Sequence, residues 1–206
     1  MKGYIDASAM LDESTPVFLG DESLNLKSKS DEIFKISNMS LGCHLGTHIY
    51  APSHLIYEKM SVCDIPIDTL IGESIILDFT LFDTCKNEEG KLPSLSAREV
   101  TKKLDSFDSF PAPRVFFKIG HSFSGLDTSV CELLIKNGVV LVGIDTMSIE
   151  ENPEYPAHKA LLSSQIPIIE GLCLNDISDG FYNVIALPMR LKNAEASPCR
   201  VVFVPI

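Results

Sequence analysis

Residues 41–56 read LGCHLGTHIYAPSHLI, and this short stretch holds three of the five histidines in the 206-residue chain. His44 and His48 are four residues apart, a spacing that places both imidazoles on one side of either a helix or a strand. Gly46 disfavours a helix interior, and Pro52 prevents a helix from continuing to the third histidine. The stretch is therefore expected to be a strand, or an extended segment that turns at Pro52.

The density of histidines is typical of a catalytic metal site, in which neutral imidazoles bind a divalent ion and one position stays open for water. The pattern is not the H-E-x-x-H motif of thermolysin-type enzymes, because Leu45 stands where that motif has its glutamate. Hydrogen-bonded structural roles for His44 and His48 are the alternative. Spacing alone leaves both interpretations open.

Two residues far along the chain are further candidates. His158 shares a face of a predicted helix with two leucines, which on its own is more typical of a core histidine than of a metal ligand. Glu170 ends the apolar run IPII, and a carboxylate at the end of a buried strand must be paired, protonated or bound to a metal. Asp145 ends another buried strand in the same way, where capping of a turn is the expected role.

Composition indicates a soluble globular protein, with 45% apolar and 22% charged residues. The length suits one domain over residues 1–206. A formal charge of −11 disfavours nucleic acid and anionic membranes as partners. The N-terminus lacks the apolar core of a signal peptide, and no run reaches the roughly 18 apolar residues of a membrane span, so a cytoplasmic location is expected. Six widely spaced cysteines without a C-x-x-C pair indicate neither a zinc ribbon nor a disulfide framework.

Runs of β-branched and aromatic residues predict several strands. The runs VVLVGI and VVFV are too continuously apolar for half-exposed strands, so we expect a mixed or parallel sheet with helices packed against it. The fold class is therefore α/β, or mixed. The predicted strands are Ser74–Leu81, Arg114–Ile119, Val139–Ile144, Tyr182–Leu187 and Arg200–Val204.

Three helices are predicted from their end signals. Ser96 and Glu99 can form a capping box, and Ser129 and Glu132 are expected to repeat it before a stop at Asn137 and Gly138. The third helix is expected near Ala157–Gln165, with Pro156 at or before its first turn, and it would place His158, Leu161, Leu162 and Gln165 on one face. Loops are expected at Cys85–Pro93 and Glu150–Pro156.

The histidine stretch HLGTHIYAPSH resembles the H-x-G-T-H-x-D-x-P-x-H motif of the cyclase-like metal-dependent hydrolases, the family of bacterial kynurenine formamidase and isatin hydrolase. The resemblance covers nearly the whole chain, and its motifs occur in the family's order. The other four matching segments are PVFLGD at 16–21, VGIDTMS at 142–148, HKALLSSQIPIIEGLCL at 158–174 and ALPMRLKNAEASPCRVV at 186–202.

This resemblance implies a swivelling β/β/α domain, a homo-oligomer such as a dimer or tetramer, and a zinc or manganese site. His44 and His48 match ligands of a first metal, and His158 and Glu170 match ligands of a second. His54 matches a proton-shuttling histidine. Phe18 stands where the formamidases have a substrate-stacking tryptophan.

Tyr50 replaces the aspartate that bridges two metals in the formamidases. A short ionised carboxylate suits a bridge between ions about 3.5 to 4 Å apart, whereas a phenol with a reference pKa of about 10 is a poor ligand at neutral pH. We therefore expect one bound ion rather than two. Tyr50 would then line the substrate pocket.

Two functional hypotheses follow. The first is a metal-dependent hydrolase of an amide or related carbonyl substrate, in which a metal-activated water attacks the carbonyl and His54 shuttles the proton. The second is a catalytically impaired relative that keeps the pocket and binds a small molecule or a partner. Retention of the histidines and of Glu170 favours the first hypothesis, and Tyr50 motivates the second.

Overall fold

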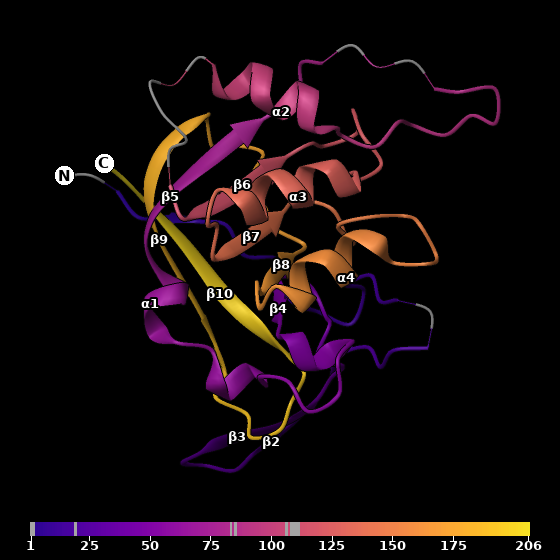
Figure 1. Ribbon diagram of the computed structural model, residues 1–206. Helices are drawn as coiled ribbons and strands as arrows, with labels where there is room; N and C mark the ends of the chain where they lie inside the picture. The colour runs from indigo at the N-terminus through magenta and orange to yellow at the C-terminus, as the bar shows by residue number, and fades with distance from the viewer. Residues whose placement is uncertain (1–2, 19, 83, 85, 106, 108–111) are drawn as a thin grey trace.

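The computed structural model describes residues 3–18, 20–82, 84, 86–105, 107 and 112–206. Its eight-stranded mixed sheet has the order β1-β10-β4-β8-β7-β6-β5-β9, and an added β9–β10 pairing closes it into a barrel (Figure 1). The elements are β1 (Ile5–Asp6), β2 (Asn25–Ser30), β3 (Lys35–Ser40), β4 (His48–Tyr50), η1 (Pro52–His54), η2 (Val62–Asp64), α1 (Ile67–Leu70), β5 (Ile71–Asp78), α2 (Ala97–Leu104), β6 (Arg114–Lys118), α3 (Thr128–Lys136), β7 (Leu141–Ile144), α4 (Pro156–Ser163), β8 (Ile168–Glu170), β9 (Gly180–Pro188) and β10 (Ala196–Pro205).

Strands β5, β6, β7 and β8 run parallel to one another, and the pairings that involve β4, β9 and β10 are antiparallel. Because successive side chains of a strand point to opposite faces, each apolar run contributes side chains to two separate hydrophobic cores. On β5, Ile75 and Leu77 pack with residues of α2, α3 and α4, whereas Ile76 belongs to the second core, with residues of β9 and β10. The helices thus cover one face of the parallel strands, as continuous apolar runs predict.

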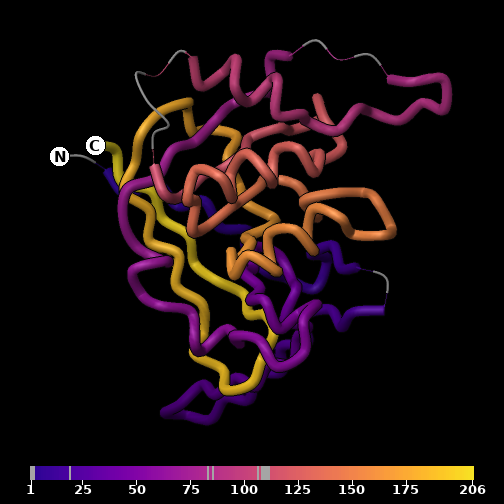
Figure 2. Tube along the Cα trace, viewed as in Figure 1, coloured from indigo at the N-terminus to yellow at the C-terminus, as the bar shows by residue number. Residues whose placement is uncertain are grey.

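The β1 strand pairs with β10, so the first described residues lie beside the other end of the chain (Figure 2). In contrast, β2 and β3 pair with each other in a separate two-stranded sheet. This hairpin projects from the lower end of the molecule in Figure 1.

The expected α/β class, with a mixed sheet and packed helices, is confirmed. The Ser96–Glu99 capping box of α2 is also present, and Pro156 is the first residue of α4. The five predicted strands correspond to β5, β6, β7, β9 and β10 with shifted ends; β5 begins at Ile71 rather than Ser74 and ends at Asp78. Part of the predicted Cys85–Pro93 loop lies outside the described residues.

Two predicted helix details are wrong. The α3 helix is capped by Asp127, whose carboxylate accepts a hydrogen bond from the Ser129 amide at 2.9 Å, so the expected Ser129–Glu132 box does not form. The hydroxyl of Ser129 instead accepts from the amide of Ala97, at 3.1 Å, at the start of α2. The α4 helix ends at Ser163, and Gln165, at φ +62°, is exposed beyond its buried face.

Candidate active site

Strand β4 presents the central residues of the site. His48 and Tyr50 point to the face that α4 covers, while Ile49 between them enters the second core. In the antiparallel pairing with β8, His48 lies directly opposite Glu170. Directly opposed residues have Cβ atoms roughly 5 Å apart, so the register itself brings an imidazole and a carboxylate together.

A close approach of two backbone segments fixes the position of His48. Gly46 has φ +62°, and Gly171, just after β8, has φ +68°. A Cβ atom on Gly171 would lie 2.4 Å from the carbonyl oxygen of Gly46, which only glycine avoids. The hydroxyl of Thr47 donates to the Gly171 carbonyl at 2.6 Å and joins the two segments.

Glu170 is a buried carboxylate with four polar neighbours. Its Oε1 accepts hydrogen bonds from the Tyr50 hydroxyl at 2.8 Å and from the Ile149 amide at 2.5 Å. His158 Nε2 lies 3.4 Å from Oε1, and His48 Nε2 lies 3.5 Å from Oε2. Burial opposes ionisation, but His158 and, when its ring is protonated, His48 outweigh it and lower the pKa of Glu170 to about 2.

His158, on α4, is held by a second buried carboxylate, that of Glu150. Glu150 Oε1 accepts from the backbone amide of His158 at 2.9 Å and from its Nδ1 at 2.7 Å. Burial alone would lower the pKa of this imidazole, but Glu150 and Glu170 together raise it to about 9. The arrangement leaves Nε2 aimed at Glu170.

Tyr50 is buried at the centre of these groups. Its ring stacks on that of His158, with centroids 5.7 Å apart. Burial, followed by the adjacent charge of Glu170, raises the pKa of Tyr50 well above 10. The phenol is therefore a hydrogen-bond donor at neutral pH, not a phenolate.

His44 and His54 complete the cluster from the segments that flank β4. Their ring centroids are 4.6 Å apart, and that of His54 is 5.0 Å from Tyr50. Partial burial, with the nearby His44 and His158, lowers the pKa of His54 to about 4. Burial also lowers the pKa of His44, whose Nε2 lies 3.4 Å from Glu195. Both rings are neutral at pH 7.

These residues line a cavity of about 410 Å³. Phe18 and Tyr155 stand on its wall and also border a neighbouring cavity of about 480 Å³. The structure therefore brings together every site residue expected from the sequence. The lining comprises Phe18, Asp21, His44, His48, Tyr50, His54, Leu55, Ser148, Tyr155, His158, Glu170 and Glu195.

The donor chemistry of this cavity fits one divalent ion. His48 Nδ1 donates to the Gly46 carbonyl, 2.9 Å away, so a neutral His48 ring carries its lone pair on Nε2; among the described residues this buried atom has no hydrogen-bond partner. His158 is oriented through Nδ1 by Glu150, as metal-binding histidines generally are. However, no group of three or more His, Cys, Asp or Glu side chains in the described part of the chain already surrounds a common point. Tyr50 and Ile149 instead occupy one oxygen of Glu170.

A family model described as "Putative cyclase" matches residues 5–151. The chain belongs to this cyclase family. The family predicted from the histidine motif is thus confirmed, and the matched range includes His44, His48, Tyr50 and His54 but not His158 or Glu170.

Similar proteins, both curated sequences and solved structures, match almost the whole chain. A kynurenine formamidase of Geobacillus thermodenitrificans is 31% identical, over 97% of this chain and 96% of its own; that of Salinibacter ruber is 27% identical over the same shares. Among solved structures, a predicted metal-dependent hydrolase from Bacillus stearothermophilus has a TM-score of 0.77, 25% identity and 98% and 97% coverage of the two chains. Isatin hydrolase A from Labrenzia aggregata shares the fold, with a TM-score of 0.84, 22% identity and 98% and 93% coverage.

Three acidic residues near the site were not predicted: Asp21, Glu150 and Glu195. Asp21 is the last residue of the segment PVFLGD, and Glu195 lies within the matching segment at 186–202. Both residues could therefore have been predicted from their positions in segments that resemble the family. Glu150 begins a polar loop and carries no such signal. Glu150 lies in the segment between β7 and α4 and is buried in contact with His158.

Proposed function

We propose that this protein is a metal-dependent hydrolase of an amide or related carbonyl substrate. The observation that carries the proposal is the unpartnered Nε2 of His48, buried 3.5 Å from the ionised Glu170. When the His48 ring is neutral, these two groups are electron-pair donors side by side, and a bound cation between them would stabilise the arrangement. The kynurenine formamidase relatives support amide hydrolysis, and the structure named as a metal-dependent hydrolase supports the metal.

The ion, zinc or manganese, would be held by His48 and Glu170 with help from His44 and His158. When bound, such an ion polarises a carbonyl group and lowers the pKa of water toward 7. One ion is expected, because the Tyr50 hydroxyl already donates to Glu170 and supplies no carboxylate between two ions.

The remaining steps belong to side chains of this chain. His54 is neutral at pH 7, so its ring can accept a proton from the attacking water and return it to the leaving nitrogen. Phe18 offers an aromatic face to the small-molecule substrate. The phenol of Tyr50 holds Glu170 in place and borders the reacting group.

The test is to measure zinc and manganese in the purified protein by mass spectrometry, and then to assay formyl-aryl amides, aryl formates and cyclic amides with added metal. We expect about one ion per chain and hydrolysis of at least one class. His54→Ala should reduce turnover while leaving metal content unchanged. Metal content far below one ion, with no hydrolysis after reconstitution, would contradict the proposal.

The Tyr50–Glu170 hydrogen bond favours a second candidate, a catalytically impaired relative that binds a small molecule or partner. Tyr50→Asp separates the two: if Tyr50 alone prevents a second ion from binding, metal stoichiometry should rise toward two. Tyr50→Phe, which removes the hydroxyl but adds no carboxylate, is the matched control. An unchanged stoichiometry in Tyr50→Asp would favour a pocket that has diverged further.

A homo-oligomer, a cytoplasmic location and the absence of a nucleic-acid partner stay predictions. No helix in the described residues is long and apolar enough to cross a bilayer.

A further inference from the structure

A second cavity adjoins the candidate active site. It encloses about 480 Å³, against about 410 Å³ for the cavity that the histidines line, and we call the two the side cavity and the histidine cavity. Phe18, Ser148 and Tyr155 line both, so the two spaces meet at the wall that these side chains form. Each alone has a volume typical of small-molecule sites, about 300 to 1,000 Å³. A ligand held at the histidines therefore has room for a second arm.

Tyr155 stands at this shared wall in an unusual backbone conformation. Its φ of +53° and ψ of +47° lie in the left-handed region, which bulky residues rarely adopt. Its amide donates to the Asn152 carbonyl at 3.0 Å, and its own carbonyl accepts from the Lys159 amide at 3.0 Å. The Tyr155 ring meets that of His158 edge to face, with centroids 5.5 Å apart. Because strained residues of this kind concentrate at ligand-binding sites, the conformation points to a binding role for the ring.

Phe18 and Tyr155 are both partly open at the shared wall. The exposed fractions of the two residues are 42% and 43%. Aromatic rings carry a large apolar surface and pack favourably against other rings. Leu92 and Phe123 add apolar side chains to the side cavity, and His121 adds an imidazole. An aromatic ring is thus the group that this wall is suited to hold.

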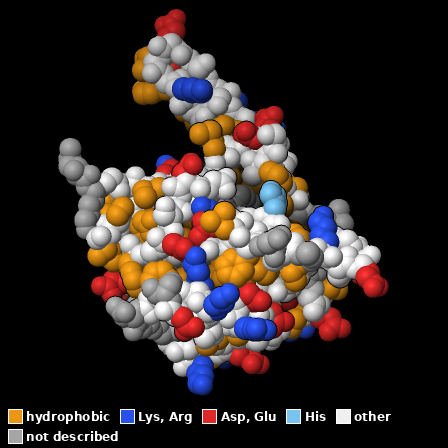
Figure 3. All heavy atoms as spheres, turned by 90° about the horizontal axis from the view of Figure 1, so that it is seen from above, with side chains coloured by type: hydrophobic (Ala, Val, Ile, Leu, Met, Phe, Trp, Pro, Cys, Tyr) orange, Lys and Arg blue, Asp and Glu red, His pale blue; other side chains and the backbone are white. Residues whose placement is uncertain are grey.

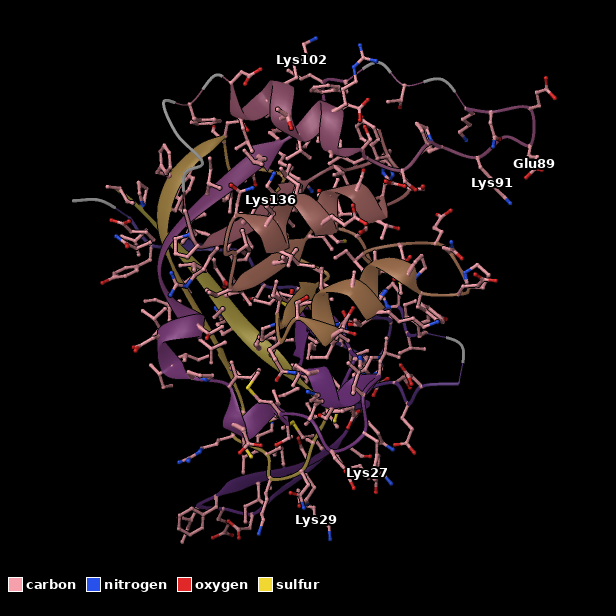
Figure 4. The ribbon with its side chains drawn as sticks, in the orientation of Figure 1. Lys27, Lys29, Glu89, Lys91, Lys102 and Lys136 are labelled. Carbon is pink, nitrogen blue, oxygen red and sulfur yellow. The ribbon has the colours of Figure 1, made fainter. Side chains whose placement is uncertain are left out.

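The charge of the lining identifies the second arm. Among the described residues, no lysine or arginine lines either cavity, whereas Glu150 and Glu151 line the side cavity. Basic side chains are exposed elsewhere on the surface, as Figure 3 shows. Lys91 directly precedes the lining residue Leu92, but its Nζ pairs with Glu89 Oε2 at 3.1 Å and its side chain extends into solvent (Figure 4). The side cavity is therefore suited to a positively charged group.

Glu151 is the carboxylate that is available to such a group. The carboxylate of Glu150 is buried, and it already accepts from His158 Nδ1 at 2.7 Å. Glu151 is exposed and lines the side cavity, and within the described part of the chain its carboxylate has neither a hydrogen bond nor an ion pair. A partly solvated carboxylate can pair with an ammonium group without the large desolvation cost of a buried pair.

We propose that the two cavities bind one elongated substrate, an aryl amide whose arm beyond the ring carries a positive charge. The scissile amide lies at the histidines, the ring packs against Phe18 and Tyr155, and an alkylammonium arm enters the side cavity beside Glu151. An anionic arm would be repelled by Glu151 and would meet no lysine or arginine among the described lining residues. This inference rests on the proposed function, because it names the substrate class of the same site.

The experiment compares three formanilides that differ only in the para substituent, which is 2-aminoethyl, 2-hydroxyethyl or carboxymethyl. Values of kcat/KM are measured with metal-supplemented protein at pH 8, where the ammonium and the carboxylate are both charged. Phenylureas with the same three arms resist hydrolysis, and their Kd values are measured by isothermal titration calorimetry. In both series the ammonium compound should be favoured about fivefold over the hydroxyl compound, and the hydroxyl compound about fivefold over the carboxylate.

Two pairs of variants locate the effect. Glu151→Gln should abolish the preference for the ammonium arm, whereas Glu154→Gln should keep it, because Glu154 is exposed in the same loop but lines neither cavity. Tyr155→Ala should weaken binding of all three phenylureas about tenfold, whatever their charge. Tyr57→Ala is its control, since Tyr57 is 91% exposed and lines neither cavity. Circular dichroism must show all variants folded.

Equal binding of the three phenylureas, binding of none, or a preference for the carboxylate would overturn the inference. So would a preference for the ammonium arm that survives in Glu151→Gln, or a Kd that Tyr155→Ala leaves unchanged. Hydrolysis of all three formanilides at equal rates would contradict the charge preference and leave the proposed function standing. Intact formanilides, with selective binding of the ammonium phenylurea, would contradict the proposed function but not the charge preference of the site.

Discussion

At the scale of single residues, some members of the candidate site could be predicted from the sequence, and others are recognised only from contacts that the fold creates. Glu170 could be predicted because a buried carboxylate requires partners, and His44 and His48 because of their spacing, whereas His54 and His158 were assigned by the resemblance to the family. The role of Glu150 could not be predicted from the sequence. Glu150 orients His158 through a 2.7 Å contact between its carboxylate and Nδ1, and this contact exists only because a loop brings the two residues together. Tyr50 is recognisable in the sequence because it replaces the aspartate of the family motif, but the sequence does not predict its hydrogen bond to Glu170.

Removing the Tyr50 hydroxyl should destabilise the metal-free protein. Tyr50→Phe leaves one oxygen of the buried, ionised Glu170 with fewer donors, so we expect a loss of about 2 kcal/mol in the free energy of unfolding. Urea unfolding of the chelator-treated protein measures it. In Tyr182→Phe, the matched control, the hydroxyl donates to the neutral carbonyl of Ser178, and the loss should be about 1 kcal/mol. Equal losses of unfolding free energy in the two variants would mean that the charge of Glu170 does not strengthen its hydrogen bond with Tyr50.

At the scale of elements, continuous apolar runs predicted the buried strands well, because strands covered on both faces need no alternation. The β2–β3 hairpin was missed for the opposite reason. Its strands NLKSKS and KISNMS are exposed on both faces, so no burial pattern marks them. The start of α3 was misplaced because two neighbouring residues, Asp127 and Ser129, can both cap a helix, and local sequence does not decide between them.

The cap of α3 gives a pH-dependent prediction. Hydrogen bonds from Ser129 hold the pKa of Asp127 below its usual value of 3.8. A group with a lowered folded-state pKa stabilises the fold above its unfolded pKa, and this stability is lost as the pH falls through the folded value. Asp127→Ala should therefore cost about 1 kcal/mol at pH 7 and progressively less below pH ~4.

Thermal or urea unfolding of this variant between pH 7 and pH 3 checks the prediction. Asp127→Asn is the control, because an asparagine caps without ionising, and its difference from alanine should not change with pH. A difference between wild type and Asp127→Ala that stays constant down to pH 3 would show that the carboxylate charge does not contribute.

At the scale of the whole molecule, the sequence indicated a mixed sheet but not its closure. Closure depends on β10, which pairs with β9 along one edge and with β1 and β4 along the other. The β9–β10 pairing joins neighbouring segments, but β10 must also pair with β4 and β1, as in His48 with Pro198 and Ile5 with Phe203, and no local pattern encodes these distant registers. The resemblance to a family supplied the architecture instead.

The interleaving of the two cores predicts one cooperative unfolding transition for residues 1–206, as a single domain requires. On β5, Ile75 and Leu77 belong to one core and Ile76 to the other, so neither core can open without the strand that both share. Circular dichroism and intrinsic tyrosine fluorescence should give coincident urea curves at a fixed protein concentration. Two separated transitions would indicate independent units.

The position of β10 along the chain also bears on how the protein is made. While residues 196–205 are still being synthesised, β9 and β4 each have an edge without its partner. Unpaired strand edges are sites of aggregation, and contacts between distant segments form slowly. The nascent protein therefore passes through a stage in which the parallel strands and their helices can assemble but the barrel is open. Chaperones that bind extended segments should associate with it at this stage and leave when the last strand inserts.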